Sequence, residues 1–276
     1  MSRLFPLLAS RPWPLVMGVV NVTPDSFSDG GRFARPEAAR DHGLQLLADG
    51  ADILDLGAES TRPGAAETPE EEERARLLPA LAALRAATDA ALSIDTRKPG
   101  VIRAAAAHDV DLWNDVSALT FAPDSLATAA ALPLPVVLMH ARGLPATMQI
   151  DPQYDDVARE VRGFLAARIG AAVAAGVAPG RLLVDPGVGF GKTLAHNLSL
   201  MRDLATLRAL GRPVLFGASR KRFIAALDAP AGEGERLGGS IAAALWAASQ
   251  GAAIVRVHDV RETVQALKVW RAVLAS

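Results

Sequence analysis

Short apolar segments alternate with longer segments of mixed polarity along the whole chain. Eight apolar segments predict strands, at residues 15–21, 53–57, 91–95, 112–115, 136–139, 182–185, 214–217 and 254–257. Their apolar residues are consecutive and do not alternate with polar ones. Both faces of each strand are therefore expected to be buried, as in a parallel sheet.

A helix is predicted after each strand. The expected ranges are 36–49, 68 onward, 99–108, 124–132, 155–175, 197–209, 220–227 with 237–250, and 260–274. Thr68, Pro69 and Glu71 predict a capping box at the start of the second helix. The acidic run that follows at residues 70–73 suits the positive end of that helix and is expected to be solvated, so we assign it no function.

Eight strand–helix units in 276 residues predict an α/β fold of the (β/α)8 or TIM-barrel type, because such barrels have typically about 250 residues. We expect residues 1–276 to form a single domain and residues 1–13 to be a disordered or packed tail. A doubly wound open sheet is the alternative arrangement.

Polar residues stand at or just after the end of every predicted strand. They are Asn21, Asp55 or Glu59, Asp95, Asn114 with Asp115, His140, Asp185, Ser219 with Lys221, and Arg256 with His258. In a barrel these positions meet at one mouth, where active sites are built. One such residue could be a helix cap or a satisfied core group, but a complete set favours a functional site.

The residue types at this mouth favour a flat heterocycle and a phosphorylated group. Asp95, Asn114 and Asp185 can read the edge of a ring, because a carboxylate matches a guanidine-like edge that donates two parallel hydrogen bonds. Arg62, Lys221, Arg256 and His258 supply positive charge suited to phosphate. The sequence shows no Ser-His-Asp order, no zinc-binding His-Glu-x-x-His and no glycine-rich dinucleotide fingerprint after the first strand.

The glycine-rich segment 186–192 follows the strand that ends at Asp185. Gly191, Lys192 and Thr193 resemble the end of a P-loop, but the spacing from Gly187 is one residue too short, and Pro186 stands where the first glycine belongs. We therefore do not predict a P-loop, and Asp185 becomes the candidate functional residue of this segment.

Composition narrows the possible functions. The chain has no cysteine, which excludes disulfides, thiolate metal sites and a cysteine nucleophile, and predicts a reducing, cytoplasmic location. Its net charge of −1 gives no reason to expect nucleic acid as a partner. We expect no membrane association, because no apolar run approaches the roughly 18 residues of a membrane span and residues 1–10 lack the apolar core of a signal peptide.

Several long motifs resemble those of the dihydropteroate synthase family, in the order in which they occur there. They are residues 17–31 (Met-Gly-Val-Val-Asn-Val-Thr-Pro-Asp-Ser-Phe-Ser-Asp-Gly-Gly), 56–64 (Leu-Gly-Ala-Glu-Ser-Thr-Arg-Pro-Gly), 93–96, 114–116, Met139-His140 with Gly143 and Met148-Gln149, 185–187 with Gly189-Phe190, 219–221 and 256–258. The resemblance covers nearly the whole chain.

The resemblance implies a transferase of folate synthesis that depends on Mg2+. Such an enzyme condenses (7,8-dihydropterin-6-yl)methyl diphosphate with p-aminobenzoate and releases diphosphate and 7,8-dihydropteroate. The resemblance also implies a homodimer, and sulfonamides that compete for the aminobenzoate pocket. The last two predicted helices carry Trp246 and Trp270 and could provide the dimer face.

The resemblance also assigns a role to each matching residue. The pterin would be held by Asp95, Asn114, Asp185 and Lys221, with Arg256 against the ring. The diphosphate would be held by Thr61, Arg62, Arg256 and His258, and its Mg2+ by Asn21. The aminobenzoate pocket would contain Phe27, Pro63 and Phe190, with Asp29 and Arg62 organising the first two loops. Val257, between two of these residues, and Met139 are further candidate substrate contacts, although Met139 could equally be core.

Some assignments stay open. Arg222 stands where many family members have a serine near the aminobenzoate carboxylate, so it is left unassigned. Asp55 is expected to be a structural residue of the barrel. A pterin-binding barrel that transfers a methyl group is one alternative, but it has no need for the segments 61–63 and 219–221. A non-catalytic relative is the other, and the presence of Asn21, Arg62, Lys221 and Arg256 argues against it.

Overall fold

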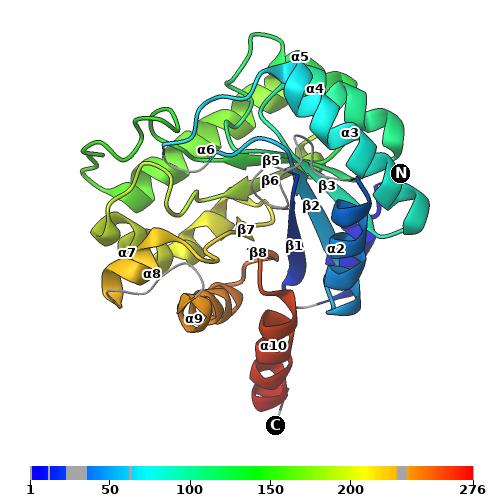
Figure 1. Ribbon diagram of the computed structural model, residues 1–276. Helices are drawn as coiled ribbons and strands as arrows, with labels where there is room; N and C mark the ends of the chain where they lie inside the picture. Colours follow the sequence, from blue (N-terminus) through cyan, green and yellow to red (C-terminus); the bar gives the residue numbers. More distant parts are fainter. Residues whose placement is uncertain (1, 12, 23–35, 62–63, 229–234, 276) are drawn as a thin grey trace.

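The eight predicted strands form one parallel sheet that closes into a barrel in the computed structural model (Figure 1), which describes residues 2–11, 13–22, 36–61, 64–228 and 235–275. The strands are β1 (Leu15–Asn21), β2 (Ile53–Gly57), β3 (Ala91–Asp95), β4 (Leu112–Asp115), β5 (Val136–Met139), β6 (Leu182–Asp185), β7 (Leu215–Phe216) and β8 (Ile254–Val257). Their order is β6-β5-β4-β3-β2-β1-β8-β7. An isolated parallel bridge between Val184 and Val214 joins β6 to β7 and completes the ring. The TIM-barrel prediction is confirmed, and the open sheet is wrong.

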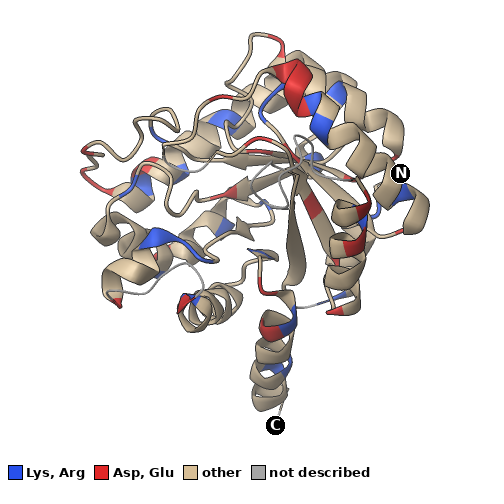
Figure 2. Cartoon of the chain, viewed as in Figure 1, with Lys and Arg blue, Asp and Glu red and all other residues tan. Residues whose placement is uncertain are grey.

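Helices surround the barrel on its outside (Figure 1). They are α2 (Pro36–Ala48), α3 (Glu70–Ala87), α4 (Pro99–Ala105), α5 (Ser125–Ala131), α6 (Val157–Ala174), α7 (Leu194–Arg202), α8 (Arg222–Leu227), α9 (Leu237–Ser249) and α10 (Val260–Ala275), with short 3-10 segments η1 (Ala106–His108), η2 (Pro179–Arg181) and η3 (Leu204–Leu210). Leu77, Leu81 and Leu84 show why α3 packs as it does: their spacing places them on one face, and all three are fully buried. Charged residues of both signs are spread over the outer helices (Figure 2).

The core has two layers because strand side chains point alternately inward and outward. An inner cluster fills the amino-terminal end of the barrel and consists of Leu4, Leu15, Met17, Ile53, Ala91, Leu112, Val137, Leu183, Leu215 and Ile254. A larger outer cluster lies between the strands and the helices. The members of the inner cluster show which alternate residues of each strand face the interior. They therefore also identify which polar residues face the interior at the carboxyl ends of the strands.

The amino-terminal segment is a helix, α1 (Leu4–Ser10). Leu4 is buried in the inner cluster, and Leu7 and Leu8 pack against it. The backbone N–H of Arg3 donates to Asp111 Oδ1 at 2.6 Å. Of the two expectations for this tail, packing is therefore correct and disorder is wrong for residues 2–11.

The start of α3 differs from the predicted capping box. The helix begins at Glu70, its N-cap is Pro69, and no side chain caps it. The backbone N–H of Thr68 donates to Glu59 Oε1 at 3.0 Å. The expectation that the acidic run is solvated is wrong for Glu73, which is fully buried, because Lys98 reaches its carboxylate.

A buried ion network joins the segment after β2 to the segment after β3. Lys98 Nζ lies 2.7 Å from Glu73 Oε2 and 2.9 Å from Glu59 Oε2. Arg97 donates to both carboxylate oxygens of Glu59 at 3.0 Å, and Thr96 Oγ1 donates to Glu73 Oε1 at 2.6 Å. Burial opposes ionisation of Glu59, but hydrogen bonds from Arg97 and Lys98 outweigh it and lower the pKa of Glu59. This network fixes Glu59, and through it the backbone of Thr68, against the barrel.

Replacing Lys98 with methionine is expected to lower the free energy of unfolding by about 3–5 kcal/mol, since it leaves the buried carboxylate of Glu73 without its counterion. Urea unfolding at pH 7.5 measures the loss. The loss should shrink at pH 5, because burial raises the pKa of Glu73 and protonation removes its unpaired charge. Lys268→Met is the control, because Lys268 is exposed on α10, and a change within about 0.5 kcal/mol is expected. A loss below about 1 kcal/mol for Lys98→Met would contradict the role of the network.

Among the described residues, no helix combines the length and the apolar character needed to cross a membrane.

Candidate active site

Polar residues line the inner face of the barrel at the carboxyl ends of its strands. Asn21 pairs in register with Gly57, Gly57 with Asp95, and Asp95 with Asn114. These four positions therefore form one row across β1 to β4. Gly57 leaves space in this row between Asn21 and Asp95, where a Cβ atom would lie 3.3 Å from the Cβ of Asp95.

Arg256 on β8 connects Asp95 in this row to Asp55, which lies two residues before Gly57 on β2. Its Nε donates to Asp55 Oδ2 at 2.6 Å, and its second guanidinium nitrogen donates to Asp95 Oδ2 at 2.8 Å. Asp55 Oδ2 also accepts from Asn114 Nδ2 at 3.1 Å. Asp55 is fully buried, whereas 23% of the Arg256 side chain is exposed. Asp55 thus orients Arg256 and Asn114 and leaves the outer part of the guanidinium available to a ligand.

The electrostatics of the interior favour a ligand that donates hydrogen bonds. Burial raises the pKa of Asp95 to about 7, although the charge of Arg256 opposes the shift. Burial likewise raises the pKa of Asp185, against the charge of Lys221. Burial also lowers the pKa of Lys221 to about 8. The partners that the two acids have do not outweigh their burial, and a ring edge that donates to them would favour their charged forms.

Asp185 ends β6 and begins the glycine-rich segment. Its Oδ1 accepts from the backbone N–H of Gly187 at 2.6 Å, and 6% of the residue is exposed. Gly189 has a φ of +83°, and a Cβ atom there would lie 3.0 Å from Cδ of Lys221. The positive φ and the close approach of Lys221 explain why a glycine occupies this position.

Lys221 links the loop after β7 to the loop after β6. Its Nζ donates to the carbonyl oxygen of Val188 and lies 4.4 Å from the centre of the Phe190 ring. Lys221 is also the N-cap residue of α8. This cation–π contact places the ammonium group, the aromatic ring and the end of β6 together at the barrel mouth.

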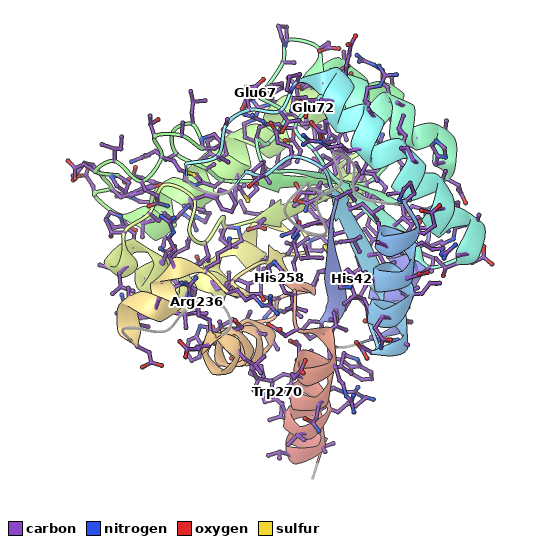
Figure 3. All side chains as sticks on the ribbon, in the orientation of Figure 1. His42, Glu67, Glu72, Arg236, His258 and Trp270 are labelled. Atoms are coloured by element: carbon purple, nitrogen blue, oxygen red, sulfur yellow. The ribbon has the colours of Figure 1, made fainter. Side chains whose placement is uncertain are left out.

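His258 directly follows the carboxyl end of β8 and is labelled in Figure 3. Its backbone N–H donates to Ser219 Oγ at 3.2 Å, and its Nδ1 lies 3.1 Å from the same oxygen. The helix α10 begins two residues later, at Val260. A histidine beside a helix amino terminus is a suitable environment for a phosphate group.

The structure brings most of the predicted site residues to this mouth. Asn21, Asp95, Asn114, Asp185 and Arg256 share the inner face, and Lys221, Phe190 and His258 stand on the loops above it. Met139 is also on this face, in register with Asp185, and is 3% exposed. Thr61 is partly buried. Phe27, Asp29, Arg62 and Pro63 lie outside the described residues.

Other strand-end residues point away from the mouth. The side chain of Val257 lies in the outer cluster, so this residue can offer a ligand only its backbone. His140 packs against Phe164 with the ring centres 5.0 Å apart. Asp115 accepts from the backbone of Ser117 and Leu119 and closes a turn. Glu59 belongs to the buried ion network, and Arg222 is exposed.

Sequence reasoning missed two groups of residues. One is the ion network of Glu59, Glu73 and Lys98, for which the only signal was the cluster of polar residues directly after Asp95. The other is Lys192, which we noted only in excluding a P-loop. Lys192 is 3% exposed and contacts the backbone of the glycine-rich segment.

Comparison with known proteins agrees with this geometry. The family model described as pterin binding enzyme matches residues 17–258. The dihydropteroate synthase of Neisseria meningitidis is 49% identical over 264 residues, which cover 94% of this chain and 92% of that protein. A solved structure of Xanthomonas albilineans dihydropteroate synthase with 4-aminobenzoic acid is 52% identical, covers 96% of this chain and 94% of its own, and has a TM-score of 0.90. A structure from the same organism in complex with 7,8-dihydropteroate has 50% identity and a TM-score of 0.87, and covers 96% of this chain and 95% of its own.

Proposed function

The chain belongs to the dihydropteroate synthase family, and we infer that it condenses (7,8-dihydropterin-6-yl)methyl diphosphate with p-aminobenzoate to give 7,8-dihydropteroate and diphosphate. The observation that carries this inference in the molecule is the convergence of Asp95, Asn114, Asp185, Lys221 and Arg256 at one barrel mouth. A methyl-transferring or non-catalytic relative is less well supported, because curated proteins at 45–49% identity are dihydropteroate synthases.

We propose that the pterin binds in the barrel mouth with its amide and amino edge toward Asp185, Asn114 and Asp95. Support comes from their common inner face and from the raised pKa of both acids, which leaves them in need of hydrogen-bond donors. The exposed part of Arg256 would lie against the ring, as guanidinium groups do on aromatic faces. Lys221 would complete the site from the loop after β7.

The diphosphate would lie toward His258 and the amino terminus of α10, with Thr61, Arg62 and Arg256 as further contacts. The described residues contain no group of three or more His, Cys, Asp or Glu that could hold a metal ion. Mg2+ takes oxygen ligands and keeps several waters, so few protein groups hold it together with substrate phosphates. We propose the amide oxygen of Asn21 as the protein ligand. When bound, Mg2+ neutralises charge on the leaving diphosphate.

The aminobenzoate would bind on the loop side of the pterin, against Phe190. Phe27 and Pro63 are proposed for the same pocket, with Asp29 and Arg62 organising the loops that carry them. Arg222 is exposed at the start of α8, directly after Lys221, and stays unassigned.

We propose a dissociative course for the reaction. The bond between the pterin methylene carbon and the diphosphate oxygen breaks, and the electron pair leaves with diphosphate. Ionised Asp95 and Asp185 would favour the cation that remains on the pterin. The aminobenzoate nitrogen then forms the new C–N bond and loses a proton, so no covalent enzyme intermediate is required. Electron-poor pterin analogues should react more slowly, and equal rates would contradict this course.

The purified protein, mixed with pterin diphosphate, p-aminobenzoate and Mg2+, tests the proposed function. We expect diphosphate to be released only when aminobenzoate is present, and 7,8-dihydropteroate to appear in equal amount. Binding of pterin diphosphate without release would instead indicate a non-catalytic relative. Tight binding of methyl-tetrahydrofolate would indicate the methyl-transferring alternative.

We propose a homodimer that uses the outer surface of α9 and α10. These helices border a groove lined by Ile241, Leu245, Glu262, Gln265, Ala266, Val269, Trp270 and Val273. Trp270 lies on the side of α10 toward α9 (Figure 3), and Val269 and Val273 are 61% and 68% exposed. Exposed apolar residues of this kind mark contact surfaces.

The absence of cysteine supports a reducing, cytoplasmic location.

Pterin binding should release a proton below about pH 7, because the ring edge favours ionised Asp95, whose pKa burial raises to about 7. The affinity for 6-hydroxymethylpterin, which has no diphosphate, should therefore increase as the pH rises from 5.5 to 7.5. Titration calorimetry in two buffers with different ionisation enthalpies measures both quantities. The same raised pKa affects the free energy of unfolding of the unliganded protein. The contribution of protonated Asp95 is fully present below about pH 4 and is lost as the pH rises through about 7.

Asp95→Asn is the matched variant for this measurement. It cannot ionise, so its weaker pterin affinity should depend less on pH than that of the wild type. An affinity of the wild type that stays constant from pH 5.5 to 7.5, with no proton release, would show that Asp95 is already ionised in the free protein.

A further inference from the structure

Lys192 is a buried lysine that the proposed reaction does not use, and burial lowers the pKa of its ammonium group to about 7. It follows the glycine-rich segment, and 3% of the residue is exposed. Its Nζ donates to the carbonyl oxygen of Gly187 at 2.9 Å and to that of Phe190 at 3.1 Å, and lies 3.0 Å from Nδ1 of His140. An ammonium group has three N–H donors, so these three partners satisfy it completely.

His140 is suited to be the third acceptor. Burial, followed by the charges of Lys192 and Arg142, lowers the pKa of His140 to about 3, so the ring is neutral at physiological pH. Its Nδ1 can then accept a hydrogen bond from Lys192. Because His140 directly follows β5, this contact ties the glycine-rich segment to a strand end of the barrel.

The two carbonyl partners of Lys192 lie at the two ends of a tight turn. The backbone N–H of Phe190 donates to the carbonyl oxygen of Gly187 at 3.1 Å, so residues 187–190 close on themselves. Gly187 has a φ of +66°, and a Cβ atom there would lie 1.8 Å from the carbonyl oxygen of His140. The turn is therefore pressed against the end of β5, and Lys192 bonds both of its ends.

This turn carries the parts of the site that no strand supports. Asp185 is held within the sheet, where the backbone N–H of His140 donates to its carbonyl oxygen at 3.0 Å. Phe190 lies five residues farther along, and its ring contacts Lys221 Nζ at 4.4 Å. The position of the Phe190 ring depends on the turn. The backbone of Asp185 is fixed by the strand, and its carboxylate contacts the turn only through the N–H of Gly187.

We propose that Lys192 is a positioning residue for the aminobenzoate half of the site, acting through the turn 187–190 on Phe190. This inference rests on the proposed function, because it divides the site into a pterin half built on strands and an aminobenzoate half built on this turn. Lys192 touches neither substrate. Its hydrogen bonds set the place of the aromatic ring against which aminobenzoate would bind.

Lys192→Met removes the three donors and keeps a chain of similar length. We expect the KM for aminobenzoate to rise at least about tenfold, the effect of losing one hydrogen bond to a charged group. The affinity for pterin diphosphate should change less than about threefold, because the carboxylates on β3 and β6 keep their places. Lys192→Gln retains two donors and should give an intermediate KM, and it carries the same test should the methionine variant fail to fold.

Tyr154→Phe is the matched control. The hydroxyl of Tyr154 donates to the carbonyl oxygen of Gly191 at 2.9 Å, one residue beyond the turn. Its loss should reduce stability and leave both substrate constants within about twofold of the wild type. A general loosening of the segment would instead raise the KM for aminobenzoate in this variant as well.

A double-mutant cycle with Phe190→Ala tests whether Lys192 acts through the ring. In the Phe190→Ala background, Lys192→Met should add less than about threefold to the KM, because the positioned group is already absent. Additive losses, an unchanged KM in Lys192→Met, or equal losses for both substrates would overturn the inference. Diphosphate release by the wild type is measured in the same series, so failure of the proposed function is seen separately.

Discussion

Replacing Arg256 with methionine is expected to lower kcat/KM for diphosphate release by about 30- to 5,000-fold. Removing one member of a buried charge pair costs about 2–5 kcal/mol, and each 1.36 kcal/mol corresponds to a tenfold change in rate. Arg256 donates to Asp55 and Asp95 at 2.6 and 2.8 Å. The substitution therefore removes the guanidinium proposed to lie against the pterin. It also leaves Asp95, the carboxylate proposed to bind the edge of the ring, without this donor.

Stability should decrease together with activity in this variant. Asp55 is fully buried, and its Oδ2 would keep only the hydrogen bond from Asn114. We expect the free energy of unfolding at pH 7.5 to decrease by about 3–5 kcal/mol, measured by urea unfolding. Arg103→Met is the control, because Arg103 and Asp124 form an ion pair in which both side chains are about half exposed, and such pairs contribute about 0–1 kcal/mol.

Arg256→Lys distinguishes charge from geometry. Lysine keeps the positive charge but cannot present a planar fork to two carboxylates at once. It should recover a part of the lost stability and little of the activity. Full activity in Arg256→Lys, or an active and stable Arg256→Met, would mean that Asp55 and Asp95 keep their places without the guanidinium.

The residues of the mouth could be predicted because strand ends carry positional information. Asp95 and Asp185 each end a short apolar run, and parallel strands bring such residues to one end of a barrel. The sequence could not say which of two neighbours faces inward. Asn114 and Asp115 are adjacent at the end of β4, and only the pairing of Asn114 with Asp95 places the first inside and the second outside. The alternation along β8 likewise places the side chain of Arg256 inside the barrel and that of Val257 outside it.

Contacts between segments that are far apart in the chain could not be predicted from the sequence. Glu73 looked like one of four solvated acids at a helix start, and its burial follows from Lys98, 25 residues later. Thr68 looked like an N-cap, but Glu59 takes its backbone N–H. Helix α1 was not predicted, because seven residues are too few for a clear periodicity, and its identity as a helix depends on Leu4 entering the barrel.

The charge balance of the mouth connects these findings to the reaction. Among the described residues, the acids Asp55, Asp95 and Asp185 lie with the cations Arg256 and Lys221, and the charge of Lys192 also acts on Asp185. Burial raises the pKa of Asp95 and of Asp185, so their charged forms are unfavourable while the site is empty. It suits a ligand that brings N–H donors and that becomes positively charged when diphosphate leaves.

Replacing Lys221 with alanine tests this balance and is expected to lower kcat/KM by about 10²–10³-fold, again because a partner of buried charge is lost. The charge of Lys221 opposes the effect of burial on Asp185, so its removal should raise the pKa of Asp185 further. A carboxyl group with a raised pKa is protonated over a wider range of pH. The acid limb of the kcat/KM profile should therefore move to higher pH in the variant, and the loss of activity should be larger at pH 6 than at pH 8.

Asp185→Asn is the companion variant for this measurement. Its activity should be low at every pH, and Lys221→Ala should cost less in its background than in the wild type, because the two groups interact. An acid limb that stays in place after Lys221→Ala would mean that Asp185 does not sense the ammonium group. Lys221 would then act through Phe190, whose ring lies 4.4 Å from its Nζ, and the loss would appear in the KM for aminobenzoate and not in pterin binding.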